Sequence, residues 1–399
     1  MKTAKQLRVV FIDSEIDTDY IKSCNDKNHI LGDILVVEDD KVVHKTNQNV
    51  NALDTLSHAT LCVKIFLETA EYRCSLSFIE ILDKETNKGN VKSLVAALAW
   101  CLDNDINLIN LSIGTTSFLD MPQLIGVIDC LAKKGVIVVA GNSNEGKMTF
   151  PASFSDVISV TGIRNMTYES DFWYSNDSID RVNINCKVNS KSFKHRNKNY
   201  YINASNSFAT AVMSAKICDY INSSDEPLNI KGILLKYMLP DKSIYKKIYK
   251  KFFKNNIEIP IIALATHESI SQNSYNKLIQ QFLVDFIEYE YNGICISEQH
   301  ETNFAMKTFN LLDYTQYRIA DKLRFYSHYC NVDYILLHGN KDFIWKNFRS
   351  NDIDIIIDIS YADKCCFKKR GVQHVCFPKP NSPDCFKNIT DEIYKCLSP

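Results

Sequence analysis

The chain has 399 residues, more than one ordinary hydrophobic core holds together, and this length predicts about two or three domains of common size. Lysine and arginine number 46 against 47 aspartate and glutamate, and the resulting net charge of −1 argues against nucleic acid as a partner of the whole chain. Hydrophobic residues make up 45% and charged residues 23%, a composition that excludes a disordered protein and indicates a globular one.

Features of membrane-bound and secreted proteins are missing from the sequence. No apolar run reaches the roughly 18 residues that a bilayer crossing needs, and the first ten residues enter a strand-like run without a signal-peptide core or cleavage site. The 14 cysteines are scattered and form no Cys-x-x-Cys pair, which favours buried free thiols in a reducing compartment over a disulfide framework. We therefore expect a cytoplasmic protein without a membrane span.

Apolar runs alternate with helix-forming stretches from Leu7 to about Leu235. Continuous apolar strands that alternate with helices are typical of a parallel sheet covered on both faces, so the first domain, over residues 1–238, is predicted to be a doubly wound α/β fold. In chain order the expected elements are the strand Val9–Ile12, the helix Leu61–Leu67, the strand Ser77–Leu82, the helix Val91–Leu102, the strand Leu108–Ile113, the helix Leu124–Lys134 and the strand Val136–Ala140.

Residues 239–255 differ in character from what precedes them. Between Lys242 and Lys254 apolar pairs recur every four residues among six lysines, which predicts a basic amphipathic linker helix. This helix either is a connecting helix docked on one domain or offers a surface to anionic partners or membranes. A second, smaller α/β domain is predicted over residues 256–399, with strands at Ile259–Ala265, Ile294–Ser297, Val332–His338 and Ile353–Ile359 and helices at Ser274–Tyr289 and Pro383–Leu397.

Four polar residues of the first domain stand where chemistry gathers in a doubly wound sheet, at the carboxyl ends of strands or the starts of helices. Asp13 follows the first strand, His58 opens a helix, Asn142 follows the strand Val136–Ala140, and Ser207 opens a later helix. Taken singly, any one of them is consistent with a cap or a turn residue, and for Asp13 or Ser207 alone this structural explanation is the stronger one.

The joint order of Asp13, His58, Asn142 and Ser207 resembles that of the subtilisin-like serine proteases, the subtilase family. Asp13-Ser14 matches the family's Asp-Thr/Ser-Gly, and His58-Ala59-Thr60 matches His-Gly-Thr. The segment from Ser205 to Ala211 matches Gly-Thr-Ser-Met-Ala-Thr-Pro, and the segment from Trp173 to Asn176 resembles the family's Phe-Ser-Asn element. The resemblance covers about residues 7–235 and implies a subtilisin-like fold.

The resemblance also implies roles in acyl transfer. Ser207 would be the nucleophile, His58 the general base and then acid, and Asp13 the group that orients His58. Asn142 would stabilise the oxyanion together with the backbone N–H of Ser207. An extended peptide substrate would pair with the strand end Leu111, Ser112, Ile113 and Gly114, next to the oxyanion segment that contains Ala140 and Gly141.

Several residues depart from the family pattern. Glu15, Ala59 and Ser205 stand where the family has glycine, and Asn206 and Ala211 replace the usual threonine and proline. Glycine is required only where φ is positive or backbones approach closely, so these replacements do not exclude activity. The first strand also starts within ten residues of Met1, so regulation by a pro-domain is not expected, and we see no acidic loop of the kind that calcium needs.

The second domain begins with a strand, a loop and a helix, as nucleotide-binding domains do, but Gln272-Asn273-Ser274 stand in place of Gly-Lys-Ser/Thr. It resembles a degenerate P-loop-like domain of clostridial peptide-maturation proteins, and without the lysine we expect no NTP hydrolysis and no cofactor. The cluster Cys365-Cys366, His374 and Cys376 matches no common zinc-finger spacing, so we expect no metal there.

Three hypotheses about function follow from the sequence. The first is a cytoplasmic serine endopeptidase that matures a ribosomally synthesised peptide by leader removal, a step that rests on analogy. The alternative is a catalytically weak or inactive pseudoprotease that binds peptides as a scaffold. A third concerns the second domain alone, which would recognise a leader peptide or form a homodimer.

Overall fold

The computed structural model describes two units of the chain. Its described residues are 6–45, 56–83, 86, 88–163, 172–174, 179, 181, 184–195, 198–223, 257–266, 272–304, 306–313, 317–349, 352–358, 365–369, 372–376, 391 and 394. The first unit comprises Met1–Thr116 and Asp120–Asp241, and the second comprises Ser117–Leu119 and Lys242–Pro399. The linker helix predicted over residues 239–255 lies outside the described residues, and so does the helix predicted over Pro383–Leu397, apart from Asp391 and Tyr394.

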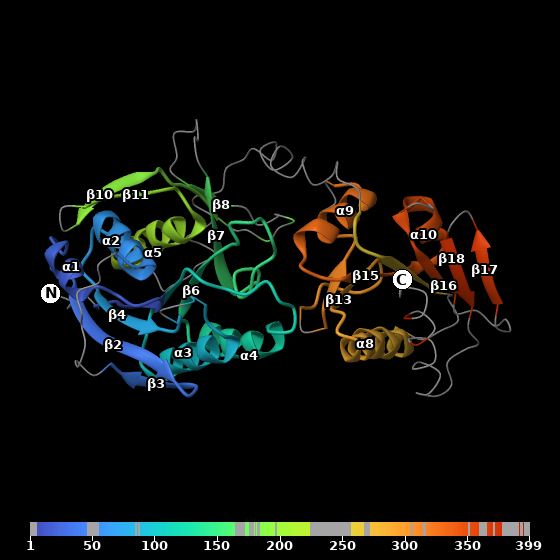
Figure 1. Ribbon diagram of the computed structural model, residues 1–399, viewed down its shortest axis with the longest axis horizontal. Coiled ribbons are helices and arrows are strands. Elements are labelled where there is room, and N and C mark those ends of the chain that lie inside the picture. Colours follow the sequence, from blue (N-terminus) through green and yellow to red (C-terminus); the bar gives the residue numbers. More distant parts are fainter. Residues whose placement is uncertain are drawn as a thin grey trace. The chain divides into compact units, whose positions relative to one another are not determined.

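A nine-stranded sheet forms the centre of the first unit (Figure 1). The strands from β2 to β9 in the sheet run parallel, and β3 and β8 pair antiparallel at its two edges. In sheet order the strands are β3 (Lys41–His44), β2 (Ile30–Glu38), β4 (Ser75–Glu80), β1 (Arg8–Asp13), β5 (Leu108–Leu111), β6 (Ile137–Gly141), β7 (Val157–Ile163), β9 (Ile184–Lys187) and β8 (Phe172–Tyr174).

Helices cover both faces of this sheet, as the continuous apolar strands require. Side chains that alternate along a strand point to opposite faces, and those of Val9 and Phe11 pack in one core cluster with α2 and α5. The other face carries α3 and α4 (Figure 1). The helices are α1 (Thr18–Ser23), α2 (His58–Thr69), α3 (Val91–Asp103), α4 (Met121–Lys133) and α5 (Asn206–Ser223), and a two-stranded sheet of β10 (Lys191–His195) and β11 (Lys198–Ile202) completes the described part.

These elements confirm the predicted doubly wound α/β fold. The predicted strands and helices between Val9 and Ala140 are all present, with boundaries that move by a few residues; the strand predicted at Ser77–Leu82, for example, runs from Ser75 to Glu80. Because β1, β5 and β6 are parallel neighbours, their carboxyl ends lie along one edge of the sheet, which brings Asp13 and the residues after Leu111 and Gly141 together.

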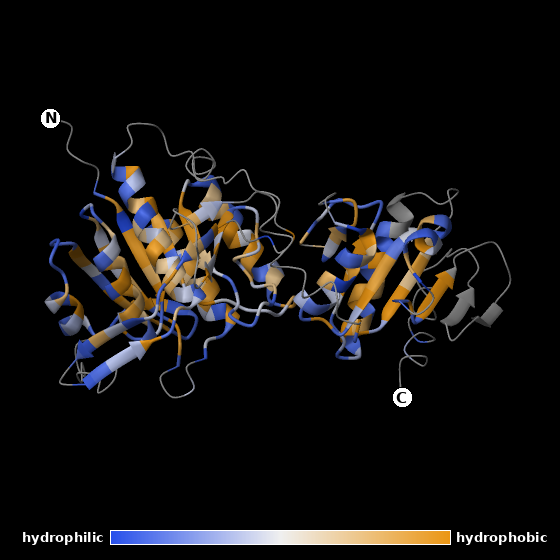
Figure 2. Ribbon diagram, turned by 90° about the horizontal axis from the view of Figure 1, so that it is seen from above, coloured by the Kyte–Doolittle hydropathy of each residue, from blue (hydrophilic) through white to orange (hydrophobic). Residues whose placement is uncertain are grey.

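A second sheet of seven strands forms the centre of the second unit. All of its pairings are parallel except that of β17 with β18, and Figure 2 shows its central strands as hydrophobic as those of the first sheet. In sheet order the strands are β14 (Thr308–Asn310), β13 (Gly293–Ser297), β15 (Tyr334–Asn340), β12 (Ile261–Thr266), β16 (Ile355–Asp358), β18 (Val372–Cys376) and β17 (Cys365–Lys369), and the helices are α8 (Gln272–Glu288), α9 (Ile319–Tyr329) and α10 (Lys341–Asn347).

The second unit therefore is the smaller α/β domain that the sequence predicts, with β12 followed by α8 at its start. The likeness of this unit to a degenerate P-loop domain stays a prediction. Cys365 and Cys366 lie on β17 and His374 and Cys376 lie on β18, whose side chains are outside the described part of the structure. Among the helices that the structure describes, none has the length and apolar character that crossing a membrane demands.

Candidate active site

Asp13 ends the buried strand β1, and its carboxylate is 1% exposed. Oδ1 accepts a hydrogen bond from the backbone N–H of Ser14 at 2.6 Å. Both carboxylate oxygens lie 2.9 Å from Nδ1 of His58. A buried carboxylate held in this way fixes the orientation of the imidazole and leaves Nε2 for other partners.

His58 is the first residue of α2, and two side chains hold the start of this helix in place. Ser57 is the N-cap, and its Oγ accepts from the backbone N–H of Thr60 at 3.2 Å. Ser14, next to Asp13, accepts from the backbone N–H of Ala59 at 3.1 Å. The carboxyl end of β1 and the first turn of α2 are thus tied together, so Asp13 and His58 meet although 45 residues separate them.

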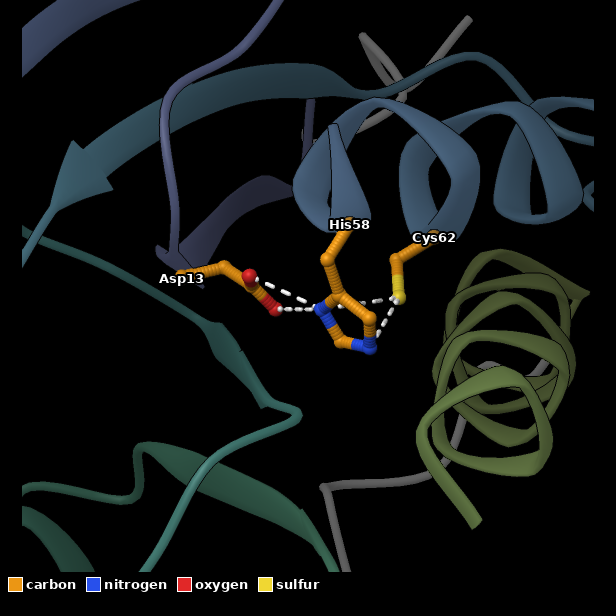
Figure 3. A group of neighbouring side chains, drawn as sticks. All are labelled: Asp13, His58 and Cys62. Atoms are coloured by element: carbon orange, nitrogen blue, oxygen red, sulfur yellow. Dashed lines mark hydrogen bonds and ion pairs between the residues drawn. The ribbon is translucent and has the colours of Figure 1, made fainter. Parts of the chain in front are cut away.

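Cys62 lies one helical turn beyond His58 and contacts the same ring (Figure 3). Its Sγ is 4.0 Å from both Nδ1 and Nε2 of His58, and it accepts a hydrogen bond from Ser112 Oγ at 3.6 Å. Its thiol also lies 4.0 Å from the carbonyl oxygen of Ser207. Sequence reasoning missed this residue; the signal that was available is its i+4 spacing from His58 on one helix.

The surroundings of His58 favour its protonated form. Cys62 and the Asp13 carboxylate raise the pKa of His58 well above its ordinary value, and this effect exceeds the lowering that burial causes. A histidine acts as a base only when it is neutral. The fraction of His58 that is able to accept a proton therefore grows as the pH becomes alkaline.

Asp13, His58 and Cys62 also form a group with the donor types of a metal site. Their ligand atoms all lie within 4.8 Å of one another, and no other such group of three occurs in the described part of the chain. However, Asp13 already binds Nδ1 of His58 through both oxygens, as expected for a carboxylate–histidine pair. A metal ion would find only two free ligand atoms, Nε2 of His58 and Sγ of Cys62. We therefore interpret the group as an Asp13–His58 pair with the Cys62 thiol beside it.

Ser207 is in the first turn of α5, and it is 8% exposed. Its hydroxyl donates to the carbonyl oxygen of Ser112 at 3.4 Å, and in the described residues it makes no hydrogen bond to His58. The fold brings Ser207 to the same group of residues as His58, since Cys62 contacts both. For proton transfer to His58, the hydroxyl must rotate away from Ser112.

Asn142 follows β6 and is joined to the start of α5 through Asn206. The backbone N–H of Asn142 donates to Val160 on β7 at 2.9 Å. Nδ2 of Asn206 donates to the carbonyl oxygens of Asn142 and Ser143 at 2.9 and 3.0 Å, and its Oδ1 accepts from the backbone N–H of Gly162 at 2.8 Å. The sequence shows Asn206 only as a departure from the family's threonine; the structure shows that it holds the predicted oxyanion segment against Ser207.

The predicted substrate-pairing segment begins inside the sheet and then leaves it. Leu111 is the last residue of β5 and pairs with Ala140 of β6, which ends at Gly141. Ser112, Ile113 and Gly114 follow, with Ser112 and Ile113 half-buried and Gly114 exposed. The structure therefore places the six predicted substrate-binding residues on two neighbouring strand ends.

The three residues that stand where the family has glycine have identifiable surroundings in the structure. The Glu15 carboxylate pairs with Lys45 at 2.7 Å, and Lys45 also pairs with Glu80 at 2.8 Å. Ala59 is buried inside the first turn of α2, where alanine is the best helix former. Ser205 lies just before α5, and its Oγ is 3.4 Å from the backbone N–H of Phe208.

A comparison with models of protein families matches residues 6–237, more than half of the chain, to the subtilase family. The chain belongs to this family. Ser175 and Asn176 of the predicted Phe-Ser-Asn element lie outside the described residues, whereas Trp173 and Tyr174 are on β8.

Two curated proteases align with parts of this chain. The major intracellular serine protease of Bacillus subtilis is 24% identical over 188 residues, which are 45% of this chain and 57% of that protein. The minor extracellular protease Epr of the same species is 27% identical over 105 residues, 26% of this chain and 16% of that protein. The chain thus spans little more than half the length of the first of these relatives and a sixth of the second.

Solved structures of two proteases also align. A lanthipeptide protease aligns with a TM-score of 0.41 and 14% identity, over 57% of this chain and 78% of that one. The prenylagaramide maturation protease PagA aligns with a TM-score of 0.36 and 18% identity, over 52% of this chain and 72% of that one.

Proposed function

We propose that this chain is a serine endopeptidase in which Ser207 is the nucleophile, His58 the general base and Asp13 the orienting carboxylate. The observation that carries this proposal is the pair that His58 Nδ1 forms at 2.9 Å with the buried carboxylate of Asp13, in a chain of the subtilase family. Ser207 lies at the start of α5, and Cys62 contacts both the His58 ring and the carbonyl oxygen of Ser207. A base next to a hydroxyl is what makes serine a nucleophile near neutral pH.

In the proposed reaction, the Ser207 hydroxyl rotates toward His58 and gives its proton to Nε2 as Oγ attacks the peptide carbonyl carbon. The new C–O bond gives a tetrahedral oxyanion, and the C–N bond breaks as His58 returns the proton to the leaving amine. A water molecule then loses a proton to His58 as its oxygen attacks the carbonyl carbon of the acyl-enzyme. The bond from this carbon to Oγ breaks as His58 returns the proton to Oγ, which releases the acid and restores Ser207. Asp13 stabilises the imidazolium at both stages.

We assign the oxyanion to the side-chain amide of Asn142 and the backbone N–H of Ser207, as the family resemblance implies. The support for this assignment is positional. Asn142 follows β6, and Asn206 bonds directly to its carbonyl oxygen, so the two proposed donors belong to one hydrogen-bonded unit.

The substrate we propose is an extended peptide that adds to the strand end Leu111–Gly114, with backbone hydrogen bonds supplying affinity. We further propose that it is a ribosomally synthesised precursor from which a leader is removed, because a second α/β unit accompanies the protease unit and offers a place for substrate recognition. We place the reaction in the cytoplasm. The nine cysteines whose side chains the structure describes are all free, which suits a reducing compartment.

The competing proposal is a peptide-binding pseudoprotease. The hydrogen bond from Ser207 to Ser112 in place of one to His58 favours it, together with the substituted glycines. The two proposals differ in whether Ser207 forms a covalent bond.

Reaction with a fluorophosphonate probe distinguishes them, because the probe phosphonylates only an activated serine. We expect the full-length chain to become labelled on Ser207 and to cleave a labelled peptide library. Ser207→Ala should abolish labelling, and His58→Ala should lower kcat by about 10⁶-fold, the loss known for subtilisin of the same family.

Ser223→Ala is the matched control, since this exposed serine at the end of α5 bonds, among the described residues, only the carbonyl oxygen of Tyr220. It should leave labelling unchanged. A folded wild-type chain that neither reacts with the probe nor cleaves any peptide would contradict the proposal and leave the pseudoprotease.

A further inference from the structure

The second unit contains a pocket of about 800 Å³ between the segment that follows β14, the start of α9 and the end of α10. This volume is in the range of pockets that hold ligands larger than a single ion. Apolar side chains line part of it, among them Leu311, Tyr317 and Ile319. Leu312 lines it as well and is 53% exposed, so its side chain is accessible to a ligand.

The charged residues of the pocket are strongly unbalanced. One acidic residue lines it, Asp352, against five basic ones: Arg318, Lys322, Arg324, Lys346 and Arg349. Clefts lined by one sign of charge concentrate ligands of the opposite sign. The whole chain has a net charge of −1, so this concentration of positive charge is local.

Only some of this charge is balanced within the unit. Asp321 pairs with Arg318 at 2.8 Å and with Arg324 at 3.4 Å, and Asp352 pairs with Arg324 at 3.5 Å. The ammonium of Lys346 and the guanidinium of Arg349 are exposed and have no hydrogen bond or ion pair with any residue that the structure describes. Both groups are available to a ligand.

Lys322 adds a buried positive charge to the pocket wall. It is 2% exposed, and its ammonium donates to the backbone carbonyl oxygens of Leu311, at 2.6 Å, and Asp313. No carboxylate of the described residues lies within ion-pair distance, although Asp313 attracts it from farther away. Burial lowers the pKa of Lys322. An ammonium has three donors, so one remains for a ligand, and an incoming anion would offset the cost of burying this charge.

We propose that this pocket binds an acidic peptide segment, with its carboxylates on Lys346, Arg349 and Lys322 and an apolar side chain on Leu312. The combination of apolar walls and unpaired basic groups fits a peptide that carries both leucine-like and glutamate-like residues, and fits a bare phosphate less well. This inference deepens the proposed function, on which it rests: the second unit would hold a part of the peptide substrate away from the cleaved bond.

Binding is measured directly with the full-length Ser207→Ala chain, so that cleavage does not interfere. The probes are two rhodamine-labelled peptides, Gly-Leu-Glu-Glu-Leu-Gly and its neutral counterpart Gly-Leu-Gln-Gln-Leu-Gly, followed by fluorescence anisotropy. We expect the glutamate peptide to bind at least about tenfold more tightly, with an affinity that falls as salt is raised. The double variant Lys346→Gln and Arg349→Gln should weaken its binding by about tenfold or more.

The control variant removes the same charge elsewhere, by Lys92→Gln and Lys277→Gln, two exposed lysines outside the pocket. It should bind the glutamate peptide as the parent does. Equal affinity for the two peptides, or equal losses in both double variants, would overturn the proposal. Displacement of the peptide by inorganic phosphate at micromolar concentration would overturn it in favour of a phosphate site.

Failure of this inference is distinguishable from failure of the proposed function. Fluorophosphonate labelling of the wild-type chain reports on Ser207 and needs no ligand in the second unit. If the chain becomes labelled but binds the two peptides with equal affinity, the protease proposal stands and the peptide-pocket proposal fails.

Discussion

Substitution of Cys62 changes the surroundings of His58 without replacing any of the proposed active-site residues Asp13, Asn142 and Ser207. The Cys62 thiol is the largest cause of the raised pKa of His58, ahead of the Asp13 carboxylate. The proposed base is neutral His58, so kcat/KM should rise with pH as His58 loses its proton. We predict that Cys62→Ala shifts this rising limb to lower pH, because one of the two causes that favour the protonated ring is gone.

The measurement is kcat/KM for one labelled peptide over a pH series, in the wild type and in Cys62→Ala. Cys101→Ala is the matched control, since Cys101 is equally buried but lies on α3, on the other face of the sheet. Its profile should coincide with that of the wild type. Coinciding profiles for all three chains would show that the Cys62 sulfur does not act on His58.

At this scale the sequence predicts the identity of the site residues better than their contacts. Asp13, His58, Asn142 and Ser207 were predicted from order and local motif, and the structure brings the first two to 2.9 Å. Cys62 was not predicted, because a cysteine on an apolar helix face is usually a packing residue. The partner of the Ser207 hydroxyl depends on a side-chain rotamer, which no sequence pattern specifies.

Among the elements, α5 and β7 approach each other closely at Gly162. A Cβ atom at this position would lie 2.8 Å from the carbonyl oxygen of Ser205, a backbone atom that cannot move without moving the start of α5. We predict that Gly162→Ala lowers kcat by displacing Ser207, and lowers the free energy of unfolding by about 1–3 kcal/mol. Peptide cleavage and urea denaturation measure the two effects.

Gly126→Ala provides the contrast. Gly126 lies within α4, and a Cβ there meets nothing within 4 Å. Alanine is the better helix former, so the free energy of unfolding should rise by about 0.5–1 kcal/mol with kcat unchanged. If Gly162→Ala behaved as Gly126→Ala does, α5 would not depend on its contact with β7.

Elements with strong apolar runs were predicted and those without them were missed. The runs at β1, β6 and β12 are buried along nearly their whole length, and each was predicted within two residues. The strand β2 was missed because it is half-exposed and contains Gly32 and Asp33, which interrupt the pattern of a buried strand. The helix α9 was missed because its apolar residues are diluted by charged ones.

For the molecule as a whole, the two units have separate hydrophobic cores. The core of the second unit consists of residues between Ile262 and Ile357, and Leu336 on β15 is completely buried in it. We predict that Leu336→Ala costs this unit about 2–5 kcal/mol of stability while Ser207 still reacts with the fluorophosphonate probe. Hydrogen exchange would show the loss of protection in β12, β13 and β15.

The reciprocal variant is Leu108→Ala, at a fully buried position of β5 in the core of the first unit. It should reduce probe labelling and leave protection of the second sheet unchanged. The contrary outcome is that Leu336→Ala loses labelling at a temperature where hydrogen exchange shows the first sheet intact. The active site would then depend on the core of the second unit.

The fold class was predictable at this scale because parallel strands buried on both faces leave a continuous apolar signal. The order of the strands in each sheet was not. In the first sheet β1 lies between β4 and β5, and in the second β12 lies between β15 and β16, arrangements that depend on contacts between segments far apart in the sequence. Those contacts have no local signature.

The neighbourhood of Cys62 has a practical consequence for the assignment of a mechanism by inhibitors. Any adduct on a sulfur that is 4.0 Å from both nitrogens of the imidazole would obstruct the turning of the ring and the approach of Ser207. A small alkylating agent that reaches this buried position would therefore silence a serine-dependent reaction. If thiol-alkylating agents were the only inhibitors tested, the loss of activity would lead to the classification of this chain as a cysteine peptidase.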